Sequence, residues 1–182
     1  MSEEQRNERI QAHIERARAL RRKGAEYCPD DAKLANGLAW ELANCADERF
    51  RDPTPAVELA RKVVKLVPHD GNSWNTLGMA LYRAGEWDEA EKALHKSMEL
   101  RQGGGAFDWL FLAMTLWRKG HKEAARKEYD RAVTWMENNK SALEKNQHQA
   151  EAAKRFRAEA AALLGVTEPP GTKEQKETPP KN

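Results

Sequence analysis

The chain has 182 residues, a formal net charge of +2, 40% hydrophobic residues and 33% charged residues. No apolar run approaches the roughly 18 residues that a membrane span needs, and the charged N-terminus lacks a signal-peptide core. We therefore expect a cytoplasmic protein with no membrane partner. The small net charge gives no strong electrostatic case for a nucleic-acid partner. The composition favours a soluble protein with many exposed helix faces.

Residues that could carry chemistry are scattered rather than grouped. Cys28 and Cys45 form no C-x-x-C pair and have no histidines at metal-ligand spacing. The triplet Pro68-His69-Asp70 reads as a turn, and Gly103–Gly105 lacks the Gly-Lys-Ser/Thr that completes a phosphate loop. No Ser-His-Asp or Cys-His arrangement can be assembled. We therefore expect no enzymatic activity, no cofactor and no metal.

In chain order, proline and glycine divide the sequence into segments rich in Ala, Leu, Glu and Lys. None of these segments shows the period-2 alternation of a strand. Asp30 and Asp31 are candidate N-caps, whereas Gly85 and Gly120 are candidate helix ends because glycine adopts the left-handed conformation without strain. The predicted helices span residues 3–24, 31–46, 54–67, 71–84, 87–102, 106–119, 122–138 and 141–164.

The two ends of the chain differ from its middle. Residues 1–29 are predicted to form a capping helix or a decayed repeat. They carry a basic cluster, Arg16, Arg18, Arg21, Arg22 and Lys23, that fits either a solvated helix face or a contact with nucleic acid or an acidic partner. Residues 140–166 are predicted to form a C-terminal capping helix with a polar outer face. Residues 167–182 are almost free of apolar side chains and are predicted to be disordered.

The middle of the chain contains an internal repeat with a step of 35 residues. A tryptophan, a leucine, small residues and a glycine recur together in two copies. The pairs are Trp74 and Trp109, Leu77 and Leu112, Gly78 and Ala113, Gly85 and Gly120, and Ala90 and Ala125. Because the small residues recur, we expect Gly78 and Ala90 to meet at a tight contact between two helices.

At these residues the sequence resembles the tetratricopeptide repeat family, whose 34-residue helix–turn–helix unit carries a W-x₂-L-G-x₂-Y pattern. The best copy opens with Trp74-Asn75-Thr76-Leu77-Gly78, although Leu81 stands where the pattern has tyrosine. The resemblance implies an all-α solenoid of about three helix–turn–helix units with helical caps. The units would occupy residues 30–139, as 30–69, 70–104 and 105–139.

The resemblance also implies a non-catalytic module that binds a peptide or partner helix on its concave face, which the first helix of each unit lines. The predicted groove residues are Asn36, Trp40, Asn75, Met79, Tyr82, Arg83, Leu110, Met114, Trp117 and Arg118. Methionines, aromatics and arginines are common at interfaces, and the arginines favour a partner with acidic and apolar side chains.

Two alternatives remain open at this level. Tyr82 and Trp117 could simply pack between neighbouring helices instead of facing a partner. The chain could also be a structural, self-assembling or spacer subunit of a larger complex, such as a signalling complex. The sequence predicts neither the identity of the partner nor the oligomeric state.

Overall fold

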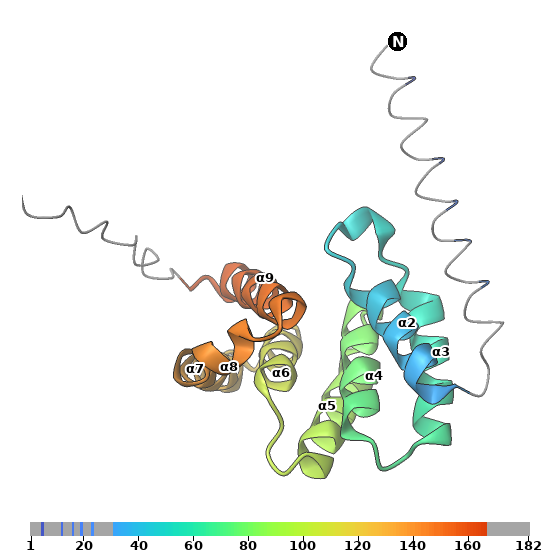
Figure 1. Cartoon of the computed structure of the whole chain (residues 1–182). Helices are drawn as coiled ribbons and strands as arrows, with labels where there is room; N and C mark the ends of the chain where they lie inside the picture. The colour runs from blue at the N-terminus through green and yellow to red at the C-terminus, as the bar shows by residue number, and fades with distance from the viewer. Residues whose placement is uncertain are drawn as a thin grey trace, which may run out of the picture.

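The computed structural model describes residues 31–166 and five isolated earlier residues, Gln5, Ala12, Arg16, Ala19 and Lys23. Apart from these five, the predicted N-terminal helix and its basic cluster lie outside the described residues, as does the predicted disordered tail. The described part contains helices and no strand, so the all-α prediction is confirmed (Figure 1). Its elements are α2 (Ala32–Asn44), the 3₁₀ turn η1 (Glu48–Phe50), α3 (Pro53–Leu66), α4 (Gly71–Ala84), α5 (Trp87–Leu100), α6 (Ala106–Arg118), α7 (Lys122–Asn138), α8 (Lys140–Glu144) and α9 (Gln147–Leu164).

Local capping chemistry sets the helix ends. Asp31 accepts a hydrogen bond from the Leu34 amide at 2.9 Å and so caps α2, as predicted. Asp70 caps α4 in the same way, accepting from the Ser73 amide at 3.0 Å. Gly85 and Gly120 have φ values of 81° and 88°, a region in which a side chain is strained. Glycine at these two positions therefore ends α4 and α6 without strain.

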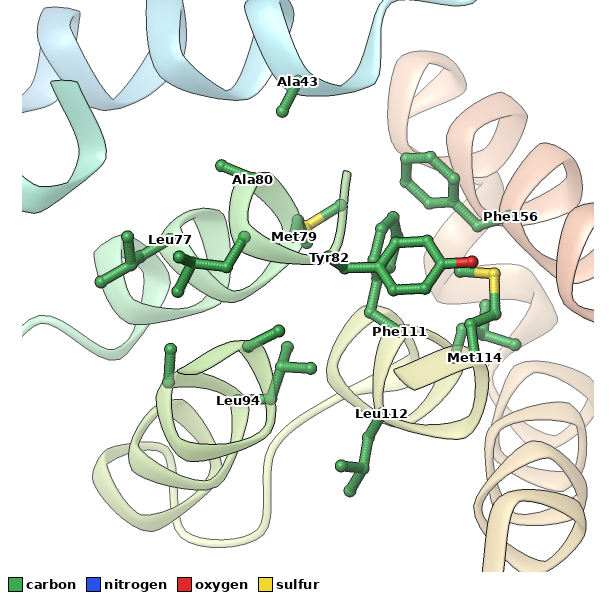
Figure 2. Packing of buried hydrophobic residues seen from close by; sticks show 14 of the residues in the cluster. Ala43, Leu77, Met79, Ala80, Tyr82, Leu94, Phe111, Leu112, Met114 and Phe156 are labelled. Atoms are coloured by element: carbon green, nitrogen blue, oxygen red, sulfur yellow. The ribbon is translucent and has the colours of Figure 1, made fainter. Parts of the chain in front are cut away.

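The helices pack as three consecutive pairs, α2 with α3, α4 with α5, and α6 with α7. The first helices of the pairs also contact one another in order, α2 with α4 and α4 with α6. We call the surface formed by α2, α4 and α6 the inner face. One continuous core runs between the pairs, and its fully buried side chains include Leu42, Leu94 and Phe111 (Figure 2).

A close approach of α4 to α5 confirms the tight contact predicted at Gly78. A Cβ atom on Gly78 would lie 2.6 Å from the Leu94 side chain and 3.2 Å from the Leu94 backbone nitrogen. The nearest neighbour of Gly78 is thus Leu94, one turn beyond the expected Ala90, which is itself fully buried. The two helices come so close because glycine has no side chain to hold them apart.

A tryptophan side chain donates a hydrogen bond to each of the turns that lead into α4 and α6. The Trp74 indole donates to the Pro68 carbonyl at 2.8 Å, and the Trp109 indole donates to the Gly103 carbonyl at 3.1 Å. In both cases the acceptor lies six residues before the tryptophan. The repeated tryptophan therefore both packs between helices and satisfies a turn carbonyl that no helix can pair.

The prediction of one helix over residues 141–164 is wrong, because the chain breaks between α8 and α9. Asn146 has an extended backbone, with φ at −121° and ψ at 96°, and its side chain accepts from the Gln149 amide at 3.1 Å. An asparagine side chain competes for backbone amides and favours a cap over a helix interior. The break lets α9 take a direction of its own.

Helix α9 contacts α6 more extensively than it contacts α7. Its N-terminal half also reaches back to the first pair, where the Arg155 guanidinium donates to the Asn44 carbonyl at 2.7 Å. A helix that only covered the end of the array would contact the last pair alone. Helix α9 instead lies against the inner face.

Candidate interaction face

The ten predicted groove residues differ in how far they are exposed. Met79, Leu110 and Met114 are fully buried, so the expectation that Met79 and Met114 face an open inner surface is wrong. Met79 is enclosed because α4 is packed by α2, α3, α5 and α6. Met114 and Leu110 are enclosed because α9 also packs against α6. These three side chains belong to the core.

Tyr82 is also buried and packs between helices, as the packing interpretation requires. Its ring meets Phe111 edge-on, with ring centroids 5.5 Å apart, and Arg83 lies 5.5 Å from its ring centroid. Burial raises the pKa of the Tyr82 hydroxyl, while a hydrogen bond with the exposed Arg118 side chain lowers it. Tyr82 therefore packs beneath the surface of the inner face, and little of its side chain is accessible to a partner.

Trp117 lies at the end of α6 and is half-buried. The Lys122 ammonium sits 3.7 Å from the Trp117 ring centroid and donates to the Trp117 carbonyl at 3.0 Å. A cation over an aromatic face is a stabilising contact. Lys122 thus covers one face of this ring and closes the turn between α6 and α7.

A pocket of about 280 Å³ opens on the inner face where α2, α4 and the start of α6 converge. Three of the predicted groove residues, Asn36, Trp40 and Asn75, line it. Its remaining walls come largely from helices and turns that the prediction did not associate with the groove. These further lining residues are Asn72, Thr76, Arg101, Gly105, Ala106, Phe107, Trp135, Leu143 and Gln149.

A buried carboxylate, Asp108, organises the wall of this pocket. It accepts hydrogen bonds from the Asn75 amide at 2.6 Å, the Ser97 hydroxyl at 2.7 Å and the Gly105 backbone at 2.8 Å, and it pairs with the Arg101 guanidinium. Burial lowers the pKa of Arg101, and the charge of Asp70 opposes that shift. The Asn75 amide nitrogen is therefore committed to Asp108 and not to a ligand.

The prediction missed Asp108, although the sequence holds a signal for it. Asp108 stands three residues after Gly105, at the position where an acidic side chain can accept from the backbone amide that precedes a helix. Its additional role as a link between α4, α5 and α6 depends on Asn75 and Ser97, which are far apart in sequence. Only the packing of the helices brings those donors together.

Two buried polar atoms of the pocket-lining residues have no hydrogen-bond partner among the described residues. They are the side-chain oxygen of Asn36 and the Nε of Arg101. Buried polar groups in folded proteins are nearly always paired. An acceptor and a donor left over beside one pocket are therefore candidate ligand contacts.

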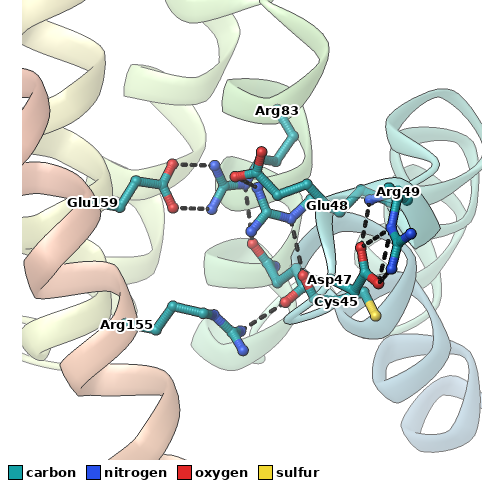
Figure 3. A network of polar contacts seen from close by, with 9 residues as sticks. Cys45, Asp47, Glu48, Arg49, Arg83, Arg155 and Glu159 are labelled. Carbon is teal, nitrogen blue, oxygen red and sulfur yellow. Dashed lines mark hydrogen bonds and ion pairs between the residues drawn. The ribbon is translucent and has the colours of Figure 1, made fainter.

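Arg83, also predicted to face a partner, is already occupied by α9. Its guanidinium forms a two-pronged ion pair with Glu159, and the Arg83 and Glu159 side chains are only 8% and 26% exposed (Figure 3). Nearby, Arg51 donates to the Cys45 carbonyl at 2.9 Å. Burial lowers the pKa of Arg51, and the positive charge of Arg83 lowers it further. Positive charge is thus concentrated beside the inner face.

The part of the chain that the structure describes contains neither a candidate metal site nor a candidate membrane-spanning helix. No group of three or more His, Cys, Asp or Glu side chains there could hold a metal ion. Within the same residues, no helix is both long enough and apolar enough to cross a membrane.

The stacked pairs define a class of protein, the helical solenoids. Family models described as tetratricopeptide repeat match residues 71–103 and 109–139, which are the α4–α5 and α6–α7 pairs. Residues 71–103 and 109–139 thus carry tetratricopeptide repeats, and the resemblance seen in that part of the sequence is confirmed. No curated protein matches the sequence significantly.

Among the solved structures that share the fold, two are crystal structures of MamA. One is 16% identical, with a TM-score of 0.54 over 87% of this chain and 93% of that chain. The other is 19% identical, with a TM-score of 0.54 over 88% of this chain and 84% of that chain. At these identities the likeness concerns the fold alone.

Tetratricopeptide repeat proteins are generally non-catalytic and act as protein-interaction modules. The chain is accordingly a protein-interaction or scaffold module.

Proposed function

We propose that the chain binds a peptide segment of a partner protein on its inner face, with the pocket between α2, α4 and α6 as the anchoring site. The support is the pocket itself, which combines aromatic walls from Trp40, Phe107 and Trp135 with unpaired polar atoms. Ligand sites in proteins have this composition, mostly apolar with a few polar groups that fix orientation.

The polar atoms match the chemistry of a peptide backbone. Each peptide unit presents one N–H donor and one C=O acceptor. The Asn36 oxygen is an acceptor without a donor, and the Arg101 Nε is a donor without an acceptor. Both atoms are buried, so a bound backbone pairs with them only when the Asn36 and Arg101 side chains turn toward the pocket. Pairing a buried polar group then removes a desolvation penalty of about 1–3 kcal/mol.

The size of the pocket suits an anchor rather than a whole ligand. Its volume of about 280 Å³ lies just below the range of small-molecule sites, which span roughly 300–1,000 Å³. Interfaces commonly bind through one or two aromatic or aliphatic side chains buried in such a pocket. We expect the partner segment to insert a large apolar side chain among the three aromatic rings.

The proposal is tested with peptides selected from a random library on the full chain. Binding of the selected peptides is measured by fluorescence anisotropy to the unsubstituted chain and to Asn36→Leu, which keeps the side-chain size and removes the acceptor. We expect a loss of at least tenfold in affinity with an unchanged melting temperature. The matched control is Asn138→Leu on the exposed side of α7, which should bind normally. Equal affinity for Asn36→Leu and the unsubstituted chain would refute this binding site.

A further inference from the structure

Helix α9 contacts the first helix of all three pairs. On α2, the Trp40 ring lies 5.3 Å from the His148 ring and 6.4 Å from the Phe156 ring. On α4, Arg83 pairs with Glu159, and on α6, the Phe111 ring lies 5.0 Å from Phe156. A segment far from these helices in sequence thus occupies the inner face beside the pocket.

Two side chains on one face of α9 anchor it there. Phe156 is fully buried against Phe107 and Phe111, and Glu159 follows it by three residues, so both side chains project from the same side of the helix. Glu159 places both carboxylate oxygens on the Arg83 guanidinium. An aromatic residue followed three positions later by a carboxylate is therefore a pattern that this face binds.

The rest of the buried face of α9 consists mostly of small side chains. Apart from Phe156 and Leu164, its buried residues are four alanines, Ala152, Ala153, Ala160 and Ala161. Alanine buries little apolar surface, and the hydrophobic contribution scales with buried area. The connection between α8 and α9, Lys145 and Asn146, is exposed, and at the start of α9 the exposed His148 contacts Trp40 through its ring.

The fit between α9 and α2 is also incomplete. The Asn44 side-chain nitrogen and the Arg155 Nε are buried and have no partner among the described residues. Arg155 adds a positive charge where Arg51 and Arg83 already lie, and Glu159 is the carboxylate that pairs with Arg83. A carboxylate at the position of Arg155 would give the Asn44 side-chain nitrogen an acceptor, while the Asn44 carbonyl would lose its Arg155 donor. It would also lower the positive charge of this cluster, in which Arg51 already pairs with Glu48 and Arg83 with Glu159.

We propose that α9 is an internal ligand of the inner face, and that an acidic amphipathic helix of a partner competes with it for this site. The partner helix carries an aromatic residue, a hydrogen-bond acceptor just before it and a carboxylate three residues after it. This inference rests on the proposed function, because it concerns the same inner face. The pocket binds one part of the partner, and the surface that α9 covers binds the partner helix. The inference adds a regulatory consequence, because the partner must displace α9 before it binds.

The probe is a fluorescent peptide with the sequence of residues 147–164 and the change Arg155→Glu. Its binding is measured on three full-length chains, the unsubstituted one, Glu159→Arg and Glu151→Arg. In Glu159→Arg the internal pair with Arg83 becomes a repulsion, so α9 is released and the peptide should bind at least tenfold more tightly. Glu151→Arg makes the same charge change on the exposed side of α9 and should bind as the unsubstituted chain does.

A charge-swapped variant gives the converse result. In Arg83→Glu with Glu159→Arg the internal pair is restored in reverse, while the carboxylate of the peptide now meets a second carboxylate at position 83 of the protein. Peptide binding should fall back to the level of the unsubstituted chain or below it. Equal binding by Glu159→Arg and the unsubstituted chain would overturn the inference, as would tight binding by the swapped variant.

If the Glu159→Arg variant fails to fold, amide hydrogen exchange of the unsubstituted chain tests the same inference. In the unsubstituted chain, the amides of α9 should exchange faster than those of α5, because α9 opens without global unfolding. Equal protection of the two helices would show that α9 is an integral part of the core and would overturn the inference. Helix α9 supplies Gln149 to the pocket wall and packs Phe156 against Trp40 and Phe107. The Asn36→Leu comparison changes an α2 side chain and leaves α9 unaltered, so failure of this inference does not by itself refute the pocket proposal.

Discussion

Two ion pairs between helices of the described part differ in how many donors their carboxylate binds. At the junction of α4, α5 and α6, Asp108 is fully buried and accepts from four donors, although the Nε of its partner Arg101 has no partner among the described residues. At the junction of α9 with the inner face, Glu159 pairs with Arg83, but two neighbouring buried donors have no partner among the described residues. The first contact lies within the repeats and the second lies between the repeats and α9.

The difference indicates which part of the protein can exchange partners. A buried charge whose bonds are all made cannot leave without exposing an unpaired group, so the junction at Asp108 should open only with the whole fold. The α9 contact holds one such ion pair, Arg83–Glu159, and its own buried side chains are alanines together with Phe156 and Leu164, so we expect it to open at a lower free-energy cost. We therefore expect α2–α7 to stay folded as one repeat body when α9 is displaced.

The largest effect is expected from Asp108→Ala, which leaves Arg101, Asn75 and Ser97 without their common acceptor. Removing one partner of a buried ion pair costs about 3–5 kcal/mol, a large share of the stability of a small domain. Urea unfolding should show this loss across the whole repeat body. The control Asp130→Ala, at an exposed position on α7, should change stability by no more than about 0.5 kcal/mol. A small effect of Asp108→Ala would remove the contrast between the two junctions.

A smaller effect is expected from Gly78→Ala, which tests how tightly the repeat body is packed. The new Cβ collides with Leu94, and overpacking a core costs about 1–3 kcal/mol, partly offset by the better helix propensity of alanine, worth up to about 1 kcal/mol. Gly37→Ala is the matched control, because nothing lies within 4 Å of its Cβ position. Thermal unfolding should therefore move in opposite directions for the two glycines. A rise for both would show that α4 and α5 can separate freely.

The substitution Glu159→Gln tests the junction between α9 and the inner face. It removes the charge that faces Arg83, and because Glu159 is 26% exposed, solvent screening limits the loss to about 1–2 kcal/mol. The loss should appear as faster hydrogen exchange in α9, with α4 and α5 unchanged. If exchange rises equally in α4, α5 and α9, then the two junctions belong to one cooperative unit.

The smallest effect is expected from Trp74→Phe, which keeps an aromatic ring and removes the indole N–H. The Pro68 carbonyl then loses its donor, at a cost of about 0.5–1 kcal/mol. Chemical denaturation of this variant is compared with that of Trp87→Phe, since Trp87 is exposed on α5. Equal stability of the two variants would mean that the turn does not need its tryptophan.

Most of the helices could be predicted because the signals that start and end them are local. The starts of α4, α5, α6 and α7 fall where the sequence places them. Asp31 and Gly85 act through neighbours a few residues away, and such contacts are visible in the sequence. The break at Asn146 was missed because an asparagine among good helix formers can stay in a helix or cap the next one.

The exposure of the inner face was predicted less well. Asn36, Trp40 and Asn75 do line the pocket, because helical spacing places them on the same side of α2 and α4. Met79 and Met114 were expected on an exposed surface but are buried, and Arg83 is paired within the chain. A repeat pattern tells which side of a helix points away from its partner helix, but it does not tell what else covers that side.

The sequence by itself determined the helical class, the repeated unit and the small residues that let helices approach, because each depends on spacing along one or two helices. Tertiary structure alone decided that α9 lies on the inner face and that Asp108 joins three helices. It also decided which polar atoms remain unpaired beside the pocket. The physical reason is distance along the chain, since Arg83 and Glu159 are 76 residues apart and Asn44 and Arg155 are 111 residues apart. No local pattern records a contact that forms only when the whole array has stacked.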